Sequence, residues 1–173
     1  DIDDLTGISQ SLKNIGTIHK KWGNYERALN YYTQALDIHE KNKDIANEAN
    51  CLYLMGAVYW NQGNFSKALE IHEESLKISE TIGEIDLKAW NFNSLGLIHK
   101  SMRNLQKAVD SFKQALLIFN DLNQKHSVAT ILENIAQIYK EAQYYEDAIE
   151  YYTHASQIYG DLGWHSNKAN TIN

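Results

Sequence analysis

The segment WGNYERALNYYTQAL, residues 22–36, is the clearest pattern in the chain, because three related copies follow it. The copies read QGNFSKALEIHEESL (residues 62–76), MRNLQKAVDSFKQAL (102–116) and AQYYEDAIEYYTHAS (142–156). One alanine recurs at a spacing of 40 residues, as Ala28, Ala68, Ala108 and Ala148. A fixed period of this length indicates a repeat architecture in which similar units stack on one another.

The residues ahead of each copy have the periodicity of a helix. We number each unit from 1 to 40, with position 1 at Ser9, Ala49, Ala89 and Ala129. In the second unit, positions 4, 7, 8 and 11 are Leu52, Met55, Gly56 and Tyr59. This spacing predicts one buried helical stripe. Position 10 is aliphatic in every unit, which predicts that this first helix contacts its partner and also the preceding helix; the residues are Ile18, Val58, Ile98 and Ile138.

The quoted copies predict a second helix in each unit and a turn ahead of it. Gly23 and Gly63 can adopt the left-handed conformation that ends a helix. An asparagine follows the turn in three units and can cap the next helix, at Asn24, Asn64 and Asn104. Small residues at positions 8 and 20 predict that the two helices cross at the low end of the roughly 8–10 Å packing range. The chain contains no proline, so the predicted fold class is all-α, built from antiparallel helix pairs.

The pattern resembles the tetratricopeptide repeat. That family favours leucine, a leucine–glycine pair and tyrosine along the first helix, then alanine, phenylalanine and alanine along the second. The second unit matches these places with Leu52, Met55-Gly56, Tyr59, Ala68, His72 and Ser75. The period of 40 residues, without a closing proline, differs from the usual form of about 34 residues. It resembles the repeats of Pins-type adaptors, kinesin light chain and Rap-type bacterial peptide receptors, and implies a right-handed α-solenoid.

The period divides the chain into four units with a fragment at each end. Residues 1–8 correspond to the tail of a preceding repeat, and 169–173 to the start of a truncated fifth repeat. The four repeats between them are 9–48, 49–88, 89–128 and 129–168. Terminal units of a repeat array need a polar cap, and neither end has one. We therefore expect an excerpt from a longer array, a ninth helix from Trp164 to Asn173, and self-association through the C-terminal end.

Composition excludes several classes of protein. The chain has 16 basic and 22 acidic residues and a net charge of -6, which argues against a nucleic-acid partner. No apolar run approaches the roughly 18 residues that a membrane span needs, so we expect no membrane partner. A single cysteine, Cys51, cannot form an internal disulfide, which favours a cytoplasmic protein.

The sequence shows no set of residues typical of catalysis or cofactor binding. Of the seven histidines, His19 and His99 share position 11 and His72 is at position 24, where this repeat buries rings. No histidine pair has metal-ligand spacing on a helix, and Cys51 has no obvious base beside it in sequence. There is no phosphate loop, dinucleotide motif or nucleophile elbow. We therefore expect no metal, no cofactor and no enzyme activity.

One face of each first helix has no neighbour in a stacked array, at positions 2, 5, 9, 12 and 13 with 6 at its margin. The family resemblance implies that this face is the concave, ligand-binding surface. The candidate groove residues are Lys13, Asn14, Lys20, Lys21, Asn50, Tyr53, Trp60, Asn61, Trp90, Asn93, Lys100, Asn134 and Lys140. The face holds five lysines and two glutamates, a local charge of +3 in a chain of net charge -6. This asymmetry favours an acidic ligand.

Alternative interpretations of these residues remain open. Lys20, Lys100 and Lys140 end their helices, where a cation also offsets the helix dipole by about 0.3–1 kcal/mol. The large aromatic side chains predict a contact surface, although Trp90 could pack on the preceding loop. Asn14 and Asn134 resemble the asparagines with which peptide-binding members hold a ligand backbone, but the other two units have Leu54 and Ser94 at this position.

The function that these observations favour is a protein–protein interaction scaffold. It would bind a peptide segment of a partner, acidic and with an apolar anchor, in the groove. The alternative is a sensor array, in which a ligand regulates an attached effector domain. Protection by a small peptide would favour the sensor, and capture of a large protein would favour the scaffold.

Overall fold

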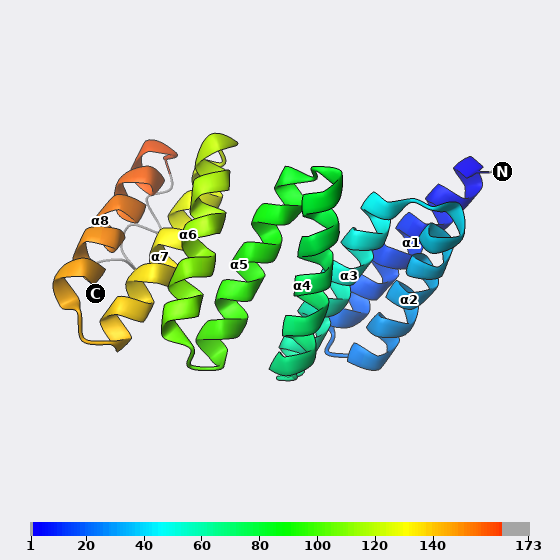
Figure 1. Cartoon of the computed structure of the whole chain (residues 1–173), viewed down its shortest axis with the longest axis horizontal. Helices are drawn as coiled ribbons and strands as arrows, with labels where there is room; N and C mark the ends of the chain where they lie inside the picture. Colours follow the sequence, from blue (N-terminus) through cyan, green and yellow to red (C-terminus); the bar gives the residue numbers. More distant parts are fainter. Residues whose placement is uncertain (1, 164–173) are drawn as a thin grey trace. The chain divides into compact units, whose positions relative to one another are not determined.

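The computed structural model describes residues 2–163 and forms eight α-helices over that range (Figure 1). The helices are α1 (Ile2–Lys21), α2 (Tyr25–Asn42), α3 (Ile45–Asn61), α4 (Phe65–Ile82), α5 (Ile85–Ser101), α6 (Leu105–Asp121), α7 (Lys125–Glu141) and α8 (Tyr145–Asp161). Residues 2–163 contain no strand, so the predicted all-α class is confirmed. The predicted ninth helix and the fragment 169–173 lie outside the described residues.

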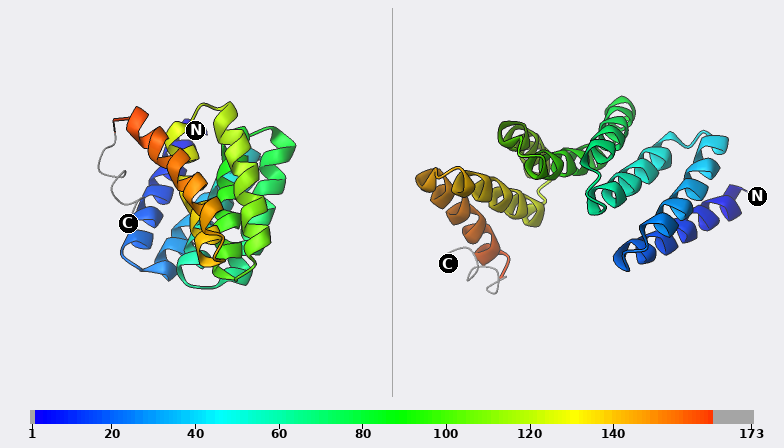
Figure 2. Two further views of the ribbon diagram at one scale, coloured as in Figure 1. Left: turned by 90° about the vertical axis from the view of Figure 1, so that its left-hand side faces the viewer. Right: turned by 90° about the horizontal axis from the view of Figure 1, so that it is seen from below.

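The chain forms two compact units that divide within α5. Unit 1 comprises residues 1–94, which include α1 to α4 and the first half of α5, and unit 2 comprises residues 95–173. In unit 1, α1 packs on α2, α2 on α3 and α3 on α4; in unit 2, α6 packs on α7 and α7 on α8. Consecutive helices within each unit run antiparallel and are joined by short turns (Figure 2).

A residue with a left-handed backbone conformation follows the first helix of each repeat, as predicted for the two glycines. We call these helices (α1, α3, α5 and α7) first-type helices and their partners (α2, α4, α6 and α8) second-type helices. Gly23 and Gly63 have φ values of 76° and 74°. The corresponding residues of the other two turns are Arg103 and Gln143, with φ values of 62° and 66°. This conformation costs a non-glycine residue roughly 1–2 kcal/mol. The turn is held by backbone hydrogen bonds such as that from Asn24 N to His19 O, at 2.9 Å.

The predicted asparagine caps are formed at one turn of three. The Asn64 side chain accepts a hydrogen bond from the backbone N–H of Lys67, at 3.2 Å. Asn24 and Asn104 make no such bond, although their backbone angles are close to those of Asn64. The prediction was therefore wrong for Asn24 and Asn104, because a suitable backbone does not determine where the side chain points.

The first-type helices begin earlier than the repeat numbering suggests. In the second, third and fourth repeats, the first-type helix begins four residues before position 1, at Ile45, Ile85 and Lys125. Residues 2–8, which were assigned to a preceding repeat, form the first turns of α1. Each first-type helix therefore presents one more turn of side chains than the sequence analysis considered.

The small residues at positions 8 and 20 allow the close crossings that were predicted. A Cβ atom added to Gly16 would lie 2.7 Å from the ring of Tyr32 and 3.2 Å from the carbonyl oxygen of Ala28. Added to Gly56 or Gly96, it would lie 2.7 Å from His72 or 2.6 Å from Phe112. In each of these three repeats, one large ring thus packs directly against the glycine backbone of the partner helix.

Neighbouring repeats pack together where the start of the second-type helix of one repeat meets the end of the first-type helix of the following repeat. Ala28 and Tyr32 of α2 form a buried cluster with Val58 of α3, and Leu29 packs against it. Val58, at position 10, is fully buried, as the sequence predicted. Ile18 has the same position but is 47% exposed, since none of the described helices lies ahead of α1 to cover it.

Candidate functional site

Unit 1 contains a groove of about 660 Å³ bounded by α1, α3 and the start of α5. Its lining residues are Gln10, Lys13, Ala46, Asn47, Asn50, Tyr53, Glu84, Asp86, Leu87 and Trp90. Four of them are candidate residues from the sequence analysis: Lys13, Asn50, Tyr53 and Trp90. The lining therefore combines three side-chain amides and two aromatic rings with one ammonium and two carboxylates.

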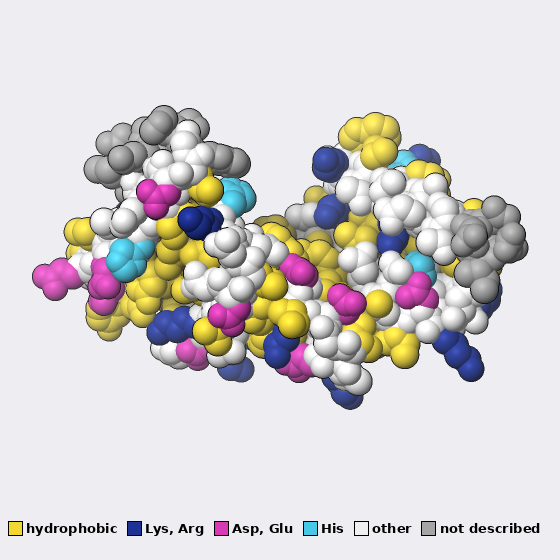
Figure 3. All heavy atoms as spheres, turned by 90° about the horizontal axis from the view of Figure 1, so that it is seen from above, with side chains coloured by type: hydrophobic (Ala, Val, Ile, Leu, Met, Phe, Trp, Pro, Cys, Tyr) yellow, Lys and Arg dark blue, Asp and Glu magenta, His cyan; other side chains and the backbone are white. Residues whose placement is uncertain are grey.

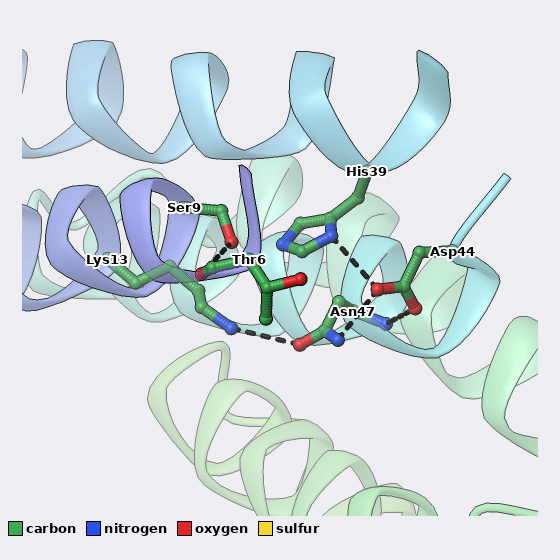
Figure 4. A network of polar contacts seen from close by, with 6 residues as sticks. All are labelled: Thr6, Ser9, Lys13, His39, Asp44 and Asn47. Atoms are coloured by element: carbon green, nitrogen blue, oxygen red, sulfur yellow. Dashed lines mark hydrogen bonds and ion pairs between the residues drawn. The ribbon is translucent and has the colours of Figure 1, made fainter. Parts of the chain in front are cut away.

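Lys13 is the most deeply placed charged group of the groove, with 6% of its surface exposed. Its Nζ donates a hydrogen bond of 3.0 Å to Oδ1 of Asn47 on α3 (Figure 4). The Asn47 amide in turn donates to Oδ2 of Asp44 at 2.9 Å, and the Asn47 backbone N–H donates to Oδ1 of the same carboxylate at 3.2 Å. Asp44 caps α3, so the lysine is oriented through the start of that helix.

The same carboxylate connects Lys13 to a buried histidine behind the groove. His39 Nδ1 lies 3.2 Å from Asp44 Oδ2 (Figure 4), and its Nε2 is buried with no hydrogen-bond partner among the described residues. Burial lowers the pKa of His39, with Lys13 adding to this effect and Asp44 opposing it. Burial raises the pKa of Asp44, but the hydrogen bonds from Asn47 and the nearby His39 outweigh it and the net pKa is lowered. Both shifts favour a neutral His39 beside an ionised Asp44 carboxylate.

The aromatic wall of the groove rests on a buried polar network. The ring of Tyr53 packs edge-on against His72, with centroids 5.4 Å apart. His72 Nδ1 lies 3.0 Å from Asn91 Oδ1, and the Asn91 amide donates to Ser75 Oγ at 2.9 Å. Ser75 Oγ then donates to the carbonyl of Ala49 at 2.9 Å. These bonds tie α3, α4 and the start of α5 together and fix the position of Tyr53.

Tyr53 and Trp90 differ in their exposure to the groove. Trp90 is 37% exposed, whereas Tyr53 is half-buried and burial raises the pKa of its phenol. Trp90 lies on α5, Tyr53 on α3 and Lys13 on α1. The groove thus combines aromatic rings from α3 and α5 with an ammonium from α1.

The remaining candidates in unit 1 do not line this groove. They are Asn14, Lys20, Lys21, Trp60, Asn61 and Asn93. Asn14 is exposed and accepts a hydrogen bond of 3.1 Å from Gln10. Lys20 is half-buried, and its pKa is lowered by burial and by Lys21. Asn93 is also half-buried, and its Oδ1 has no hydrogen-bond partner among the described residues.

The candidates of unit 2 are Lys100, Asn134 and Lys140, and they are described by themselves. Lys100 Nζ donates to Gln137 Oε1 at 2.6 Å, so it connects α5 to α7. Burial lowers the pKa of Lys100, and Glu141 opposes this effect. Lys140 is exposed near the end of α7, and Asn134 is half-buried. Lys100 therefore has a hydrogen-bond partner on α7.

Several groove residues were missed by the sequence analysis. Asn47, Glu84 and Asp86 belong to the first turns of α3 and α5 or to the residue just before them. They precede position 1 of their units, so a face counted from position 1 omitted them. The signal that could have found them is Asp44, a helix-capping residue that marks where α3 begins.

The charged side chains drawn in Figure 3 do not form a surface of one sign. On the face drawn in Figure 3, basic and acidic side chains both occur, with hydrophobic side chains between them. The groove itself has one lysine and two carboxylates, a local balance of -1. The predicted excess of positive charge on the first-type helices is therefore not a property of this groove.

Neither a metal site nor a membrane span is found among the described residues. Within residues 2–163, no group of three His, Cys, Asp or Glu side chains is placed to hold a metal ion. No helix in the same range has the length and apolar character needed to cross a bilayer. Cys51 is fully buried, and burial raises the pKa of its thiol to about 11, so it is a poor nucleophile at neutral pH.

Comparison with known families identifies the class of this repeat. The family model for the tetratricopeptide repeat matches residues 7–81 and again residues 86–161. Together the two matches cover most of the chain. The protein therefore belongs to the tetratricopeptide repeat family. The comparison with curated protein sequences gave no match.

Solved structures with similar folds include a phosphatase and a Rap protein. Aspartyl phosphate phosphatase F from Bacillus subtilis has a TM-score of 0.85 at 17% identity, over 90% of this chain and 41% of that one. A Rap protein complexed with Competence and Sporulation Factor has a TM-score of 0.84 at 19% identity, over 95% and 45%. The chain thus spans less than half the length of these two proteins. BtubC (BKLC) from P. vanneervenii has a TM-score of 0.70 at 19% identity, over 99% and 86%.

Proposed function

We propose that this protein is an interaction scaffold whose unit 1 groove binds an extended segment of a partner protein. The observation that carries the proposal is the groove lining, in which amides, two aromatic rings and one buried ammonium face a volume of about 660 Å³. Membership of the tetratricopeptide repeat family supports a binding role. A concave, mostly preformed surface with a few placed polar groups is the usual form of a binding site.

Each part of the lining suits one part of a peptide. Asn47, Asn50 and Gln10 carry side-chain amides, which can both donate to and accept from a peptide backbone. Tyr53 and Trp90 offer a rigid surface for one large apolar side chain, and such aromatic contacts dominate many interfaces. The proposed ligand therefore has an extended backbone and one apolar anchor.

Lys13 specifies an acidic group near that anchor. An ammonium has three N–H donors, and Asn47 accepts from one of them. A charge that is largely buried gains more from a carboxylate than an exposed charge does. Glu84 and Asp86, at the start of α5, favour N–H donors on the opposite side of the ligand. We therefore expect the ligand to carry one carboxylate beside its apolar anchor, rather than to be acidic along its whole length.

The second candidate function is a ligand-gated sensor that regulates an attached effector domain. The observation in its favour is the similarity in fold to a Rap protein complexed with Competence and Sporulation Factor. In both candidate functions the chain binds rather than catalyses, and the proposed location is the cytoplasm. The two differ in whether a short peptide alone is a sufficient ligand.

A peptide-display selection tests the proposed groove. We expect dodecapeptides selected on the wild-type chain to share one acidic and one large apolar residue. Trp90→Ala should weaken their binding by about 30-fold, which corresponds to the roughly 2 kcal/mol of a hot-spot residue. Lys13→Met keeps most of the side-chain volume and should weaken only the peptides that carry the acidic residue.

The matched control is Trp22→Ala, which removes a 70% exposed tryptophan at the end of α1 that does not line the groove. This variant should bind the selected peptides as the wild type does. Equal binding by wild type and Trp90→Ala would contradict the groove proposal. A thermal melt of each variant separates loss of binding from loss of fold.

A further inference from the structure

The described helices at the two ends of the array each expose an apolar face that the internal helices cover. On α1 the exposed side chains are Ile8 (49%), Ile15 (38%) and Ile18 (47%), and Trp22 (70%) follows directly after the helix. The spacing of seven and three residues places the three isoleucines on one side of the helix. On α8 the exposed side chains are Tyr145 (58%) and Ile149 (65%), four residues apart.

Corresponding positions on internal helices show what normally covers the α1 face. Val58 of α3 and Ile138 of α7 share position 10 with Ile18, and they are 0% and 3% exposed. Val58 is covered by Ala28 and Tyr32 of the preceding helix α2. In unit 2, α7 also packs on its preceding helix, α6. The α1 face is therefore shaped for a second-type helix.

The α8 face is the other half of the same kind of interface. Tyr145 and Ile149 share positions 17 and 21 with Tyr25 and Leu29 of α2. Those two residues are half-buried and pack against the cluster that contains Val58 of α3. Each helix thus carries one half of an interface that the chain forms internally between α2 and α3.

Charge is complementary between the two faces. In the α2–α3 interface, the first two turns of α2 meet the last turns of α3. The same arrangement would bring the start of α8 to the end of α1. The last turn of α1 is basic, with Lys20 and Lys21, and the first turn of α8 is acidic, with Glu146 and Asp147.

We propose that the chain associates head to tail, with α8 of one copy packing on α1 of a second copy in the way that α2 packs on α3. The sequence predicts association through the C-terminal end, and the exposed residues of α1 and α8 supply the two faces of the proposed contact. Such a contact joins two different surfaces, so each copy can bind one further copy at each of its two faces. Each face has only a few large side chains, far fewer than the roughly 20–30 residues a side of a standard interface, so the association is weak.

Sedimentation of complementary variants tests this proposal. Ile18→Asp alters only the α1 face, and Ile149→Asp alters only the α8 face. We expect the average mass of the wild type to rise with concentration, and each variant alone to remain monomeric. An equimolar mixture should form a one-to-one heterodimer, because the intact α8 face of Ile18→Asp can bind the intact α1 face of Ile149→Asp.

The control is Leu117→Asp, the same kind of change at a 60% exposed residue of α6. It should associate as the wild type does. A monomeric wild type at every concentration would overturn the proposal, and so would self-association of either single variant or the absence of a heterodimer in the mixture. Circular dichroism checks the fold of each variant. If an Asp variant loses helix, Ile18→Gln and Ile149→Gln provide the same test without a charge.

Discussion

At the scale of the residue, the glycine at position 8 is where a single atom matters most. A Cβ on Gly56 would lie 2.7 Å from both Cδ2 and Nε2 of His72. His72 cannot easily retreat, because it is 1% exposed and its Nδ1 is bonded to Asn91. A contact this short requires the ring or the helix to shift.

We expect Gly56→Ala to lower the free energy of unfolding by about 1–3 kcal/mol relative to Gly7→Ala, the cost of overpacking a filled core. Gly7 is also within a helix, but a Cβ there meets nothing within 4 Å. The comparison therefore cancels the gain in helix propensity that alanine gives at either site. Urea unfolding of the two variants provides the measurement, and equal stabilities would show that the crossing at Gly56 is not tight.

The residues of the groove could be predicted only in part. Lys13, Asn50, Tyr53 and Trp90 follow from the helical angle within one repeat, which is a local property of the sequence. The support of Lys13 by Asn47, and through it by Asp44, depends on two helices that are separated by the whole of α2. Periodicity says which side of a helix faces a neighbour, but not which side chains bond across it.

At the scale of the element, asparagines at equivalent positions of different repeats do not all form the same helix cap. Asn24, Asn64 and Asn104 have equivalent positions, yet only the side chain of Asn64 accepts a hydrogen bond from the helix it precedes. Asn64→Ala should cost about 1 kcal/mol of stability, the usual value of such a cap. Asn104→Ala removes the same side chain without a cap bond and should cost clearly less. Thermal or urea unfolding compares them, and equal losses would argue against a specific cap at Asn64.

The helix order and the turns follow from the sequence because they depend on local rules. Gly23 and Gly63 identify two turns by their conformational freedom, and the period of 40 residues locates the others at Arg103 and Gln143. The first residues of the helices were harder to predict from the sequence. Position 1 was placed by repeat similarity, whereas α3 begins at Ile45, where Asp44 supplies the first cap.

At the scale of the whole molecule, two buried histidines make the stability depend on pH. His39 is 3% exposed and His72 is 1% exposed. Burial lowers the pKa of both rings, although Asp44 opposes this for His39 and the Asn91 hydrogen bond opposes it for His72. The unfolded chain therefore binds protons at these rings more readily than the folded chain does. By linkage, their contribution is fully present above the ordinary histidine pKa of 6.5 and is lost as the pH falls below it.

The melting temperature should accordingly be lower at about pH 5.5 than at about pH 7.5. His72→Phe tests the contribution of one ring, because Tyr32 and Phe112 show that an aromatic ring fits at this position. The variant loses the bond to Asn91 and should be less stable at both pH values, but the difference between them should shrink. His154→Phe, at an exposed residue of α8, serves as the control and should keep the full difference. If His72→Phe keeps it too, His72 is not one of the groups that make the folded chain sensitive to acid.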